Sequence, residues 1–343
     1  MNRIYRIVKN KKTGLWMVAS ETATSNGGGG SASVVVAAAI CLIAPAGAWG
    51  QAGPTVSLST GQSANAYVAP NGRTTVVNIN APSAQGLSHN TYNSYNVNAG
   101  GLVLNNAAVN TGLTVQSSLA GQILTNGNLT KSATTILNEV VGTERSLLKG
   151  FTEIAGSQAG VVVSNPNGIS CSGCGFINTY HATMTTGVPT ISGGMLTGLV
   201  VTRGDIVIEG AGLNTQGVGQ GGTDSVPLLD LISRSITLNG PTNAKSLEVR
   251  TGTQAYTLDP ETQSVTGSSA VSGVGAAPVW AIDAGVLGGM YADTIRLVST
   301  EAGAGVRMLN DVATTVGDFQ LTAAGQIQLR GKISSVQDLS VAT

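Results

Sequence analysis

Short apolar segments that alternate with polar residues recur along the C-terminal part of the chain. They run from Ala292 to Leu297, from Gly317 to Leu321 and from Gln337 to Val341, with another at Gly325–Leu329. Strand-like runs at a spacing of roughly twenty residues are typical of a solenoid, in which stacked coils bury a column of Val, Ile and Leu that no single coil could hide. A β-sandwich also contains short alternating strands, so the pattern favours a solenoid without excluding a sandwich.

One segment, Ser132–Lys149, has the length and the mixture of apolar and charged residues that a helix requires. Gly142 interrupts it, and glycine is unfavourable inside a helix. The sequence therefore predicts a short helix or an irregular excursion here.

The composition agrees with many short strands and turns. Only 4% of the 343 residues are aromatic and 10% are charged, whereas 47 are glycine. Hydrophobic residues make up 42% of the chain, which favours a packed core over disorder. We therefore predict an all-β fold.

The first 48 residues resemble an export signal in their order of basic, polar and apolar parts. An apolar run from Val34 to Ala44 ends near Ala46 and Ala48, and the basic head contains Arg3, Arg6, Lys9, Lys11 and Lys12. Small residues at positions −3 and −1 fit signal peptidase, which predicts cleavage after Ala48. An uncleaved anchor is the alternative, but a membrane span needs about 20 apolar residues and this run has eleven.

Cleavage after Ala48 changes the charge and the cysteine count. It removes five of the 17 basic and one of the 17 acidic residues, which leaves 12 and 16 and a net charge of −4. No basic patch for nucleic acid remains. Cys41 also leaves, so only Cys171 and Cys174 remain, in a compartment that permits disulfides.

A tight turn is predicted at Asn165–Gly168, between the apolar run Ala159–Val163 and the segment Gly175–Thr179. Proline presets φ for the second position of a β-turn, Asn and Gly tolerate the left-handed region, and the first Asn can bond its own backbone two residues on. The turn should join two extended segments.

Cys171 and Cys174, which follow this turn, could form a zinc site, a redox pair or a local disulfide. Zinc normally takes four protein ligands, and the remaining candidates, His89 and His181, have no usual finger spacing. A thioredoxin-like pair needs a strand-to-helix context, whereas glycines flank this pair. A local disulfide is favoured, and its short loop should mainly rigidify the turn.

Catalytic motifs find little support. No Gly-x-Ser-x-Gly elbow occurs, and neither Gly27–Gly30 nor Gly217–Gly222 has the context of a nucleotide-binding loop. We expect His89 and His181 at the surface, and we expect solvated, unpaired positions for Asp224, Asp230, Asp283 and Asp293. The chain is predicted to be no enzyme, with no cofactor and no metal.

Several segments resemble a known family. MNRIYRIVKNKKTGLWMVASE looks like the extended signal-peptide region of very large exported proteins of Gram-negative bacteria. Residues from about Val56 to Gly187 resemble the secretion domain of two-partner secretion exoproteins, the filamentous haemagglutinin family. The matching stretches are VNINAPSAQGLSHNTYNSYNV (77–97), GGLVLNNA (100–107), ILNEVVG (136–142), AGSQAGVVVSNPNGISCSGCGFINT (155–179) and MTTGVP (184–189).

The resemblance implies an extended signal peptide over 1–48, a two-partner secretion (haemagglutination activity) domain over 49–200 and the start of a β-helical shaft over 201–343. The implied fold is a right-handed parallel β-helix with an N-terminal cap and extra-helical hairpins. The implied route uses the secretory translocon, signal peptidase and then an outer-membrane β-barrel transporter whose periplasmic domains recognise the N-terminal region. The protein would be secreted or held at the cell surface of a Gram-negative bacterium, and its N-terminal domain would seed folding of the rest.

The resemblance also points to two asparagine motifs. Asn165, Pro166, Asn167, Gly168 and Ile169 match the second family motif in full. The first is usually Asn-Pro-Asn-Leu, and its counterpart here is Asn126-Gly127-Asn128-Leu129, where Gly in place of Pro should keep the turn but loosen it. These residues are predicted to serve transporter recognition, folding or both.

Two functional classes are expected. One is a haemagglutinin or adhesin that binds a host or bacterial surface receptor, and the other is the delivery stalk of a contact-dependent growth inhibition toxin. A pectate-lyase-like enzyme would need clustered acidic and basic residues, which the sequence does not present. The uncapped pattern at Ser340–Thr343 suggests a fragment of a longer protein.

Overall fold

The computed structural model describes residues 5–9, 16–20, 53–215 and 226–343. The chain divides into two compact units, Met1–Trp49 and Gly50–Thr343. In the first unit, β1 (Tyr5–Lys9) and β2 (Trp16–Ser20) pair antiparallel. The predicted cleavage site at Ala48, the apolar run Val34–Ala44, Cys41, Gly217–Gly222 and Asp224 lie outside the described residues. No described helix is long and apolar enough to cross a membrane.

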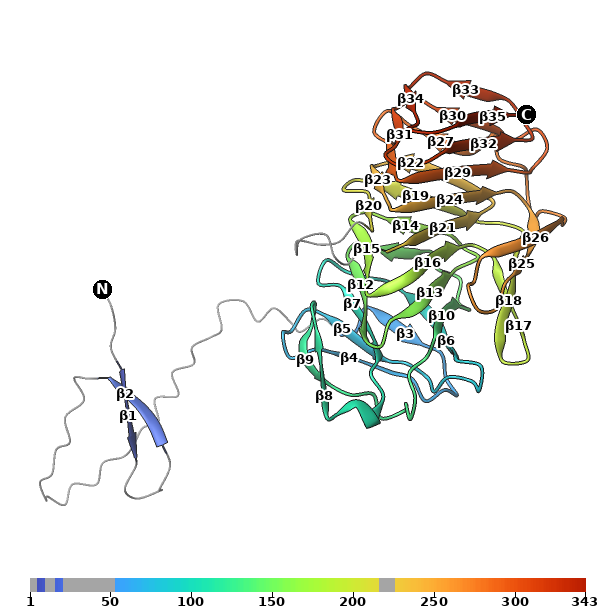
Figure 1. The fold of residues 1–343 in the computed structure, drawn as a ribbon. Coiled ribbons are helices and arrows are strands. Elements are labelled where there is room, and N and C mark those ends of the chain that lie inside the picture. The colour runs from blue at the N-terminus through green and yellow to red at the C-terminus, as the bar shows by residue number, and fades with distance from the viewer. Residues whose placement is uncertain (1–4, 10–15, 21–52, 216–225) are drawn as a thin grey trace, which may run out of the picture. The chain divides into compact units, whose positions relative to one another are not determined.

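The second unit is a stack of coils built from three sheets. In Figure 1 the stack runs from its blue N-terminal end to the red last coil. Sheet 1 consists in spatial order of β3 (Val56–Leu58), β6 (Leu87–Tyr95), β10 (Thr135–Val140), β13 (Ala159–Ser164), β16 (Thr179–Thr185), β21 (Leu228–Ser233), β24 (Ser246–Thr251), β29 (Thr294–Ser299), β32 (Phe319–Ala323) and β35 (Leu339–Ala342).

The other two sheets complete each coil. Sheet 2 consists of β11 (Ser146–Leu148), β14 (Ile169–Cys171), β19 (Asp205–Glu209), β22 (Ser235–Asn239), β27 (Trp280–Ala284), β30 (Gly305–Met308) and β33 (Ile327–Leu329). Sheet 3 consists of β4 (Asn65–Val68), β5 (Thr75–Asn78), β7 (Leu102–Asn106), β12 (Phe151–Gly156), β15 (Cys174–Ile177), β20 (Leu213–Asn214), β23 (Thr242–Asn243), β28 (Met290–Ala292), β31 (Val312–Thr314) and β34 (Ile333–Ser334).

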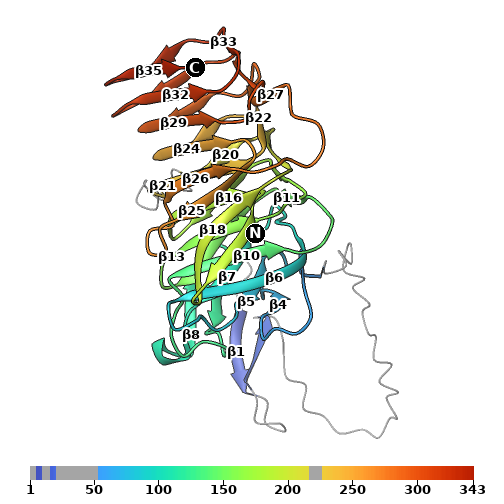
Figure 2. The ribbon, with the colours of Figure 1, turned by 90° about the vertical axis from the view of Figure 1, so that its right-hand side faces the viewer.

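Strands of successive coils pair parallel and in register, which makes the unit a parallel β-helix. Ile295 pairs with Phe319, and Phe319 pairs with Leu339, so the predicted runs at 292–297, 317–321 and 337–341 are equivalent positions of stacked coils. The run at 325–329 contains β33 of sheet 2. Inward-facing residues of all three sheets form one continuous hydrophobic core. The solenoid prediction is confirmed, and Figure 2 shows the stack from the side.

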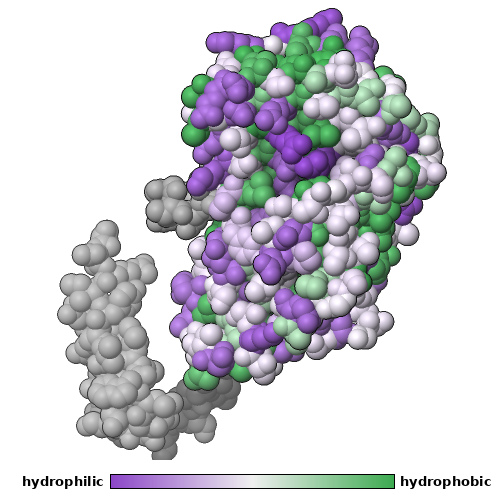
Figure 3. All heavy atoms as spheres, turned by 45° about the vertical axis from the view of Figure 1, so that its right-hand side comes forward, coloured by the Kyte–Doolittle hydropathy of each residue, from purple (hydrophilic) through white to green (hydrophobic). Residues whose placement is uncertain are grey.

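Antiparallel strands form a cap that closes the N-terminal end of the stack. β3 pairs antiparallel with β6, and β4 pairs antiparallel with β5. These strands cover edges that would otherwise expose unpaired N–H and C=O groups. At the other end, the last coil leaves Leu329, Leu339 and Val341 exposed, and Figure 3 shows apolar side chains at that end.

Two excursions lie outside the coils, as the family resemblance implies. The first consists of the 3-10 turn η1 (Val109–Thr111) and the hairpin β8 (Thr114–Ser117)–β9 (Gly121–Leu124). The second is a four-stranded antiparallel sheet of β17 (Val188–Ser192), β18 (Met195–Val201), β25 (Gln254–Leu258) and β26 (Val265–Ala270). This extra-helical sheet packs on the outer face of sheet 1 through a second hydrophobic cluster that includes Leu137, Leu199 and Tyr256.

The prediction of a short helix or an irregular excursion at Ser132–Lys149 is wrong, because this segment contains β10 and β11. Ile136 faces the solenoid core and Leu137 faces the second cluster. A strand buried on both faces is apolar without strict alternation, which is why the sequence suggested a helix. Gly142 marks a close approach, since a Cβ there would lie 2.0 Å from the carbonyl oxygen of Asn93.

Candidate functional site

The first asparagine turn, at Asn126–Leu129, connects two coils. The Asn126 side chain is fully buried and its amide donates to the carbonyls of Ile79 at 2.9 Å and Asn105 at 3.0 Å. Its Oδ1 accepts from the backbone N–H of Asn128 at 3.0 Å. The Asn128 amide donates to the carbonyls of Ser63 and Ile79.

The second turn, at Asn165–Ile169, has the same construction. Asn165 is fully buried, and its amide donates to the Glu144 carbonyl and to Ser146 Oγ, both at 2.9 Å. Its Oδ1 accepts from the backbone N–H of Asn167 at 2.9 Å, and the Asn167 amide donates to the Gly142 carbonyl at 2.8 Å.

Both turns thus share one bonding scheme. The first Asn turns the chain through its side-chain oxygen and joins an earlier segment through its amide, and the second Asn makes another such contact. In each turn the backbone N–H of the fourth residue, Leu129 or Gly168, bonds the carbonyl of the first Asn at 3.0 Å. Leu129 and Ile169 are buried in the core. Glycine at position 127 therefore keeps the hydrogen bonds that define the turn.

Two arginine side chains lie beside the second turn, and no sequence pattern indicated them. Gly168 has φ 105, and a Cβ there would lie 2.2 Å from Arg145 Nη1. Arg145 Nη2 forms an ion pair with Asp205 Oδ1 at 2.7 Å. Arg203 Nη2 donates to Asn167 Oδ1 at 3.3 Å.

Cys171 and Cys174 are joined in a disulfide, with their Cα atoms 5.4 Å apart. Both are buried where β14 passes to β15. Bonded in this way, the pair offers no thiolate for zinc. Among the described residues, no group of three His, Cys, Asp or Glu residues is placed to hold a metal ion.

The predicted surface positions of the ionisable residues need correction. His181 and Asp230 are buried, and their side chains form an ion pair at 3.0 Å. Asp283 receives two hydrogen bonds from Arg307, at 2.8 and 2.6 Å. Asp293 is half-buried and accepts from the Thr315 hydroxyl at 2.7 Å. Each partner lies at least 22 residues away in sequence, so local patterns could not reveal it.

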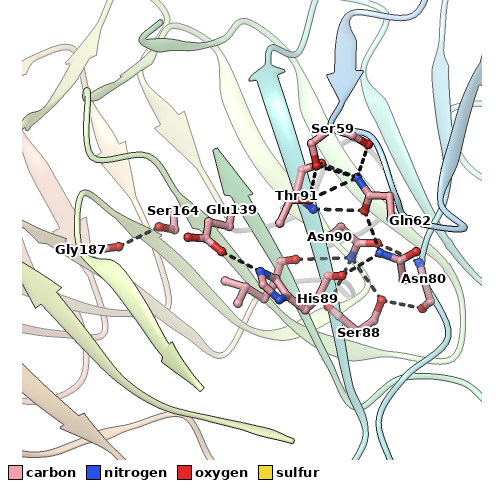
Figure 4. A network of polar contacts seen from close by, with 11 residues as sticks. Ser59, Gln62, Asn80, Ser88, His89, Asn90, Thr91, Glu139, Ser164 and Gly187 are labelled. Atoms are coloured by element: carbon pink, nitrogen blue, oxygen red, sulfur yellow. Dashed lines mark hydrogen bonds and ion pairs between the residues drawn. The ribbon is translucent and has the colours of Figure 1, made fainter. Parts of the chain in front are cut away.

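His89 is half-buried, and its Nε2 lies 2.7 Å from Glu139 Oε2. It stands beside a polar network that ties the cap to sheet 1 (Figure 4). Asn80 Nδ2 donates to the His89 carbonyl and to Gln62 Oε1, both at 2.8 Å. Gln62 Nε2 donates to the Thr91 carbonyl at 2.6 Å. Asn128 donates to the carbonyl of Ser63, the residue after Gln62. The first asparagine turn therefore holds the same cap segment.

A signal-like head, a capped parallel β-helix, extra-helical strands and paired asparagine turns together define the class of exported β-helical secretion domains. Residues 50–329 match the family described as "TPS secretion domain", and residues 1–49 match the family described as "Extended Signal Peptide of Type V secretion system". The chain belongs to the two-partner secretion family. It is a secreted protein that is exported across the Gram-negative envelope, and such a domain implies a cognate outer-membrane transporter.

A solved structure and several curated proteins are similar to the chain. The crystal structure of the filamentous hemagglutinin secretion domain matches with a TM-score of 0.68 and 32% identity, over 84% of this chain and 99% of that one. The 16S rRNA endonuclease CdiA of Enterobacter cloacae subsp. cloacae is 45% identical over 82% of this chain. The tRNA nuclease CdiA of Escherichia coli O6:K15:H31 is 45% identical over 76%.

The chain spans only 8% of the length of these two curated relatives. The matched domain is a secretion module and not a catalytic one. The predicted boundary between residues 200 and 201 stays a prediction, as do the roles of the two asparagine turns.

Proposed function

We propose that the domain starting near Gly50 is recognised by its cognate outer-membrane transporter, and that the two asparagine turns set the order in which its coils fold. The observation that carries this proposal is the shared bonding scheme of the turns. Each turn joins segments of different coils through side-chain amides, so each can form fully only when the earlier coil is present. Stepwise burial of coils outside the cell would then favour outward movement without ATP.

The two asparagines of each turn differ in accessibility. Asn126 and Asn165 are fully buried, and a partner cannot contact them once the domain has folded. Asn128, Pro166 and Asn167 keep part of their surface in solvent. We therefore assign folding to the first Asn of each turn, together with Leu129, Gly168 and Ile169, and assign any contact with the folded domain to Asn128, Pro166 and Asn167.

Export to the periplasm precedes this step in the proposal. The secretory translocon would move the chain across the inner membrane, and signal peptidase would cleave after Ala48. Mass spectrometry of the mature N-terminus tests the cleavage site, since a first residue other than Trp49 would contradict it.

The deciding experiment compares secretion of the chain with and without its transporter for wild type, Asn128→Ala and Asn167→Ala. Release that needs the transporter and is lost in either variant, while the purified variant folds normally, supports recognition through that residue. Release that falls only in proportion to the loss of stability assigns that residue to folding alone. Release without the transporter contradicts the proposed function.

Asn178→Gly is a matched control. Asn178 also donates its amide to carbonyls of an earlier coil, those of Ile154 at 2.8 Å and Gly156 at 3.0 Å, but it lies outside both motifs. Its φ of 59 suits glycine. This variant should lose coil-to-coil hydrogen bonds with no specific loss of secretion.

We infer two candidate functions for the mature protein. One is that of a haemagglutinin or adhesin bound to a surface receptor. The other, delivery of a contact-dependent growth inhibition toxin, is supported by the relatives named as CdiA nucleases. Co-culture of displaying cells with target cells separates them: contact-dependent growth arrest supports delivery, and attachment without arrest supports adhesion.

A further inference from the structure

His181, on β16, lies in a polar cluster between the outer face of sheet 1 and the extra-helical sheet. Its side chain is only 3% exposed. The ring contacts two elements far apart in sequence. Nδ1 lies 3.0 Å from the carbonyl oxygen of Thr262, in the turn that joins β25 to β26, and Nε2 lies 3.0 Å from Asp230 Oδ2, on β21.

Both contacts require a proton between the ring nitrogen and an oxygen. The Thr262 carbonyl can only accept, and an ionised Asp230 carboxylate can only accept. A neutral imidazole has one N–H and serves one of them, whereas an imidazolium serves both. Loss of the second imidazole proton therefore breaks one of the two hydrogen bonds.

The acidic groups Asp230 and Glu248 favour the protonated form of the ring. Glu248 and Arg250 on β24 form an ion pair, Arg296 on β29 lies 3.5 Å from Glu248, and the facing elements also carry Tyr256, Asp259 and Glu261. Burial alone lowers the pKa of His181. The hydrogen bond and charge of Asp230, with smaller contributions from the Thr262 carbonyl and Glu248, outweigh burial and raise that pKa.

The turn held by His181 is tight. Gln263 has φ 62, its N–H bonds the Asp259 carbonyl at 2.8 Å, and the Asp259 N–H bonds the Ser264 carbonyl at 2.9 Å. Three buried polar atoms of this region, Asp230 Oδ1, Tyr256 Oη and Gln263 Oε1, have no hydrogen-bond partner among the described residues. A buried polar region that is only partly satisfied loses stability readily when one more contact breaks.

We propose that His181 is a proton-dependent latch that holds the Asp259–Ser264 turn, and with it the β25–β26 hairpin, against the solenoid. The latch is complete below the ordinary histidine pKa of about 6.5. It is lost as pH rises through the higher pKa of the folded protein, because the deprotonated pair releases the Thr262 carbonyl or Asp230. The solenoid beneath stays folded, since its coils are held by their own ladders and core.

The chain contains only two histidines, which makes the test direct. Imidazole NMR resonances of the Gly50–Thr343 unit are titrated from about pH 5 to 9, a range centred near the ordinary histidine pKa, and His89→Gln identifies the His181 signal. Hydrogen exchange of residues 257–268 is followed over the same range and corrected for its intrinsic pH dependence. We expect a His181 midpoint above that of an ordinary histidine and at least a tenfold loss of hairpin protection at the same midpoint.

His181→Gln is the second variant, because a Gln amide has no proton to lose in this range. Its hairpin protection should be independent of pH, whereas His89→Gln should keep the wild-type response. A wild-type midpoint at or below the ordinary value overturns the proposal, as does hairpin protection that does not follow the His181 titration. If His181→Gln fails to fold, the wild-type titration and exchange data still decide.

Discussion

The carboxylate of Glu153, on β12, accepts a hydrogen bond from the hydroxyl of Ser117, at the end of β8, at 2.7 Å. The same carboxylate accepts the backbone N–H groups of Ser118 at 2.7 Å and Leu119 at 2.8 Å. One buried side chain of the solenoid thereby closes the turn of the extra-helical hairpin β8–β9. At the asparagine turns, side-chain amides likewise bond backbone carbonyls of earlier segments, so much of this fold depends on contacts between segments distant in sequence.

Replacement of Glu153 by Ala should release that hairpin turn. It leaves two backbone N–H groups and a hydroxyl without their acceptor, and a loss of about 3 kcal/mol is expected for a buried charged acceptor. Urea unfolding measures the loss, and hydrogen exchange at Ser118 and Leu119 locates it. Ser117→Ala is the control and should cost about 1 kcal/mol. Equal stability of Glu153→Ala and wild type would show that the hairpin is held by other contacts.

The first Asn of the second turn should matter more to stability than the second Asn. Asn165→Ala removes two buried amide hydrogen bonds and the acceptor for the Asn167 N–H, with an expected loss of about 2 to 3 kcal/mol. Asn167→Ala removes contacts at a half-buried position and should lose about 1 kcal/mol. Denaturant midpoints of both variants, measured at unchanged slope, test the order. The reverse order would contradict the division between folding and contact residues.

Gly127→Pro should stabilise the first turn and make it resemble the second. Gly127 has no positive φ, and no atom lies within 4 Å of a Cβ built there. Among the described residues, no hydrogen bond uses its N–H. Proline at a compatible position typically adds about 0.4–1 kcal/mol by restricting the unfolded chain. A thermal unfolding midpoint below that of wild type would mean that the turn requires the freedom of glycine.

Breaking the ion pair between the buried Arg234 and the partly buried Glu301 should destabilise the loop that leads from β26 to β27. Arg234 donates to Glu301 through Nε and Nη2 and to the Val274 carbonyl through Nη1 at 2.7 Å. Removal of one partner of such a pair typically costs about 3–5 kcal/mol. Denaturant unfolding of Arg234→Met, Glu301→Gln and the double variant measures this loss in the free energy of unfolding. The double variant should lose less than the sum of the single variants, and strict additivity would contradict direct coupling.

The Asp259 carboxylate should set the acid limit of the β25–β26 turn. It accepts the backbone N–H groups of Thr262 at 2.8 Å and Glu261 at 3.0 Å, and these bonds lower the pKa of this carboxyl. A lowered pKa means that the contribution is present above the unfolded pKa and is lost as pH falls through the folded value. Hydrogen exchange at Thr262 should therefore quicken at acid pH in wild type, and the step should vanish in Asp259→Asn.

Local chemistry in the sequence was enough to predict the all-β class, the turn at Asn165–Gly168 and the equivalent C-terminal runs. Turn residues act on their own backbone, and the apolar residues of the core column recur once per coil. Both patterns can therefore be recognised in the amino-acid sequence alone. The runs at Ile295, Phe319 and Leu339 stack on one another.

Only the tertiary structure decided which side chains are buried on the outer face of sheet 1. His181 and Asp230 are 49 residues apart, and the hairpin that covers them begins after residue 250. Their polarity suggested solvent, because nothing local indicates that an excursion will fold back over them. Leu137 misled the helix prediction for the same reason. Coil-to-coil contacts join residues whose separation changes with every inserted hairpin, so their partners become visible only when the coils are stacked.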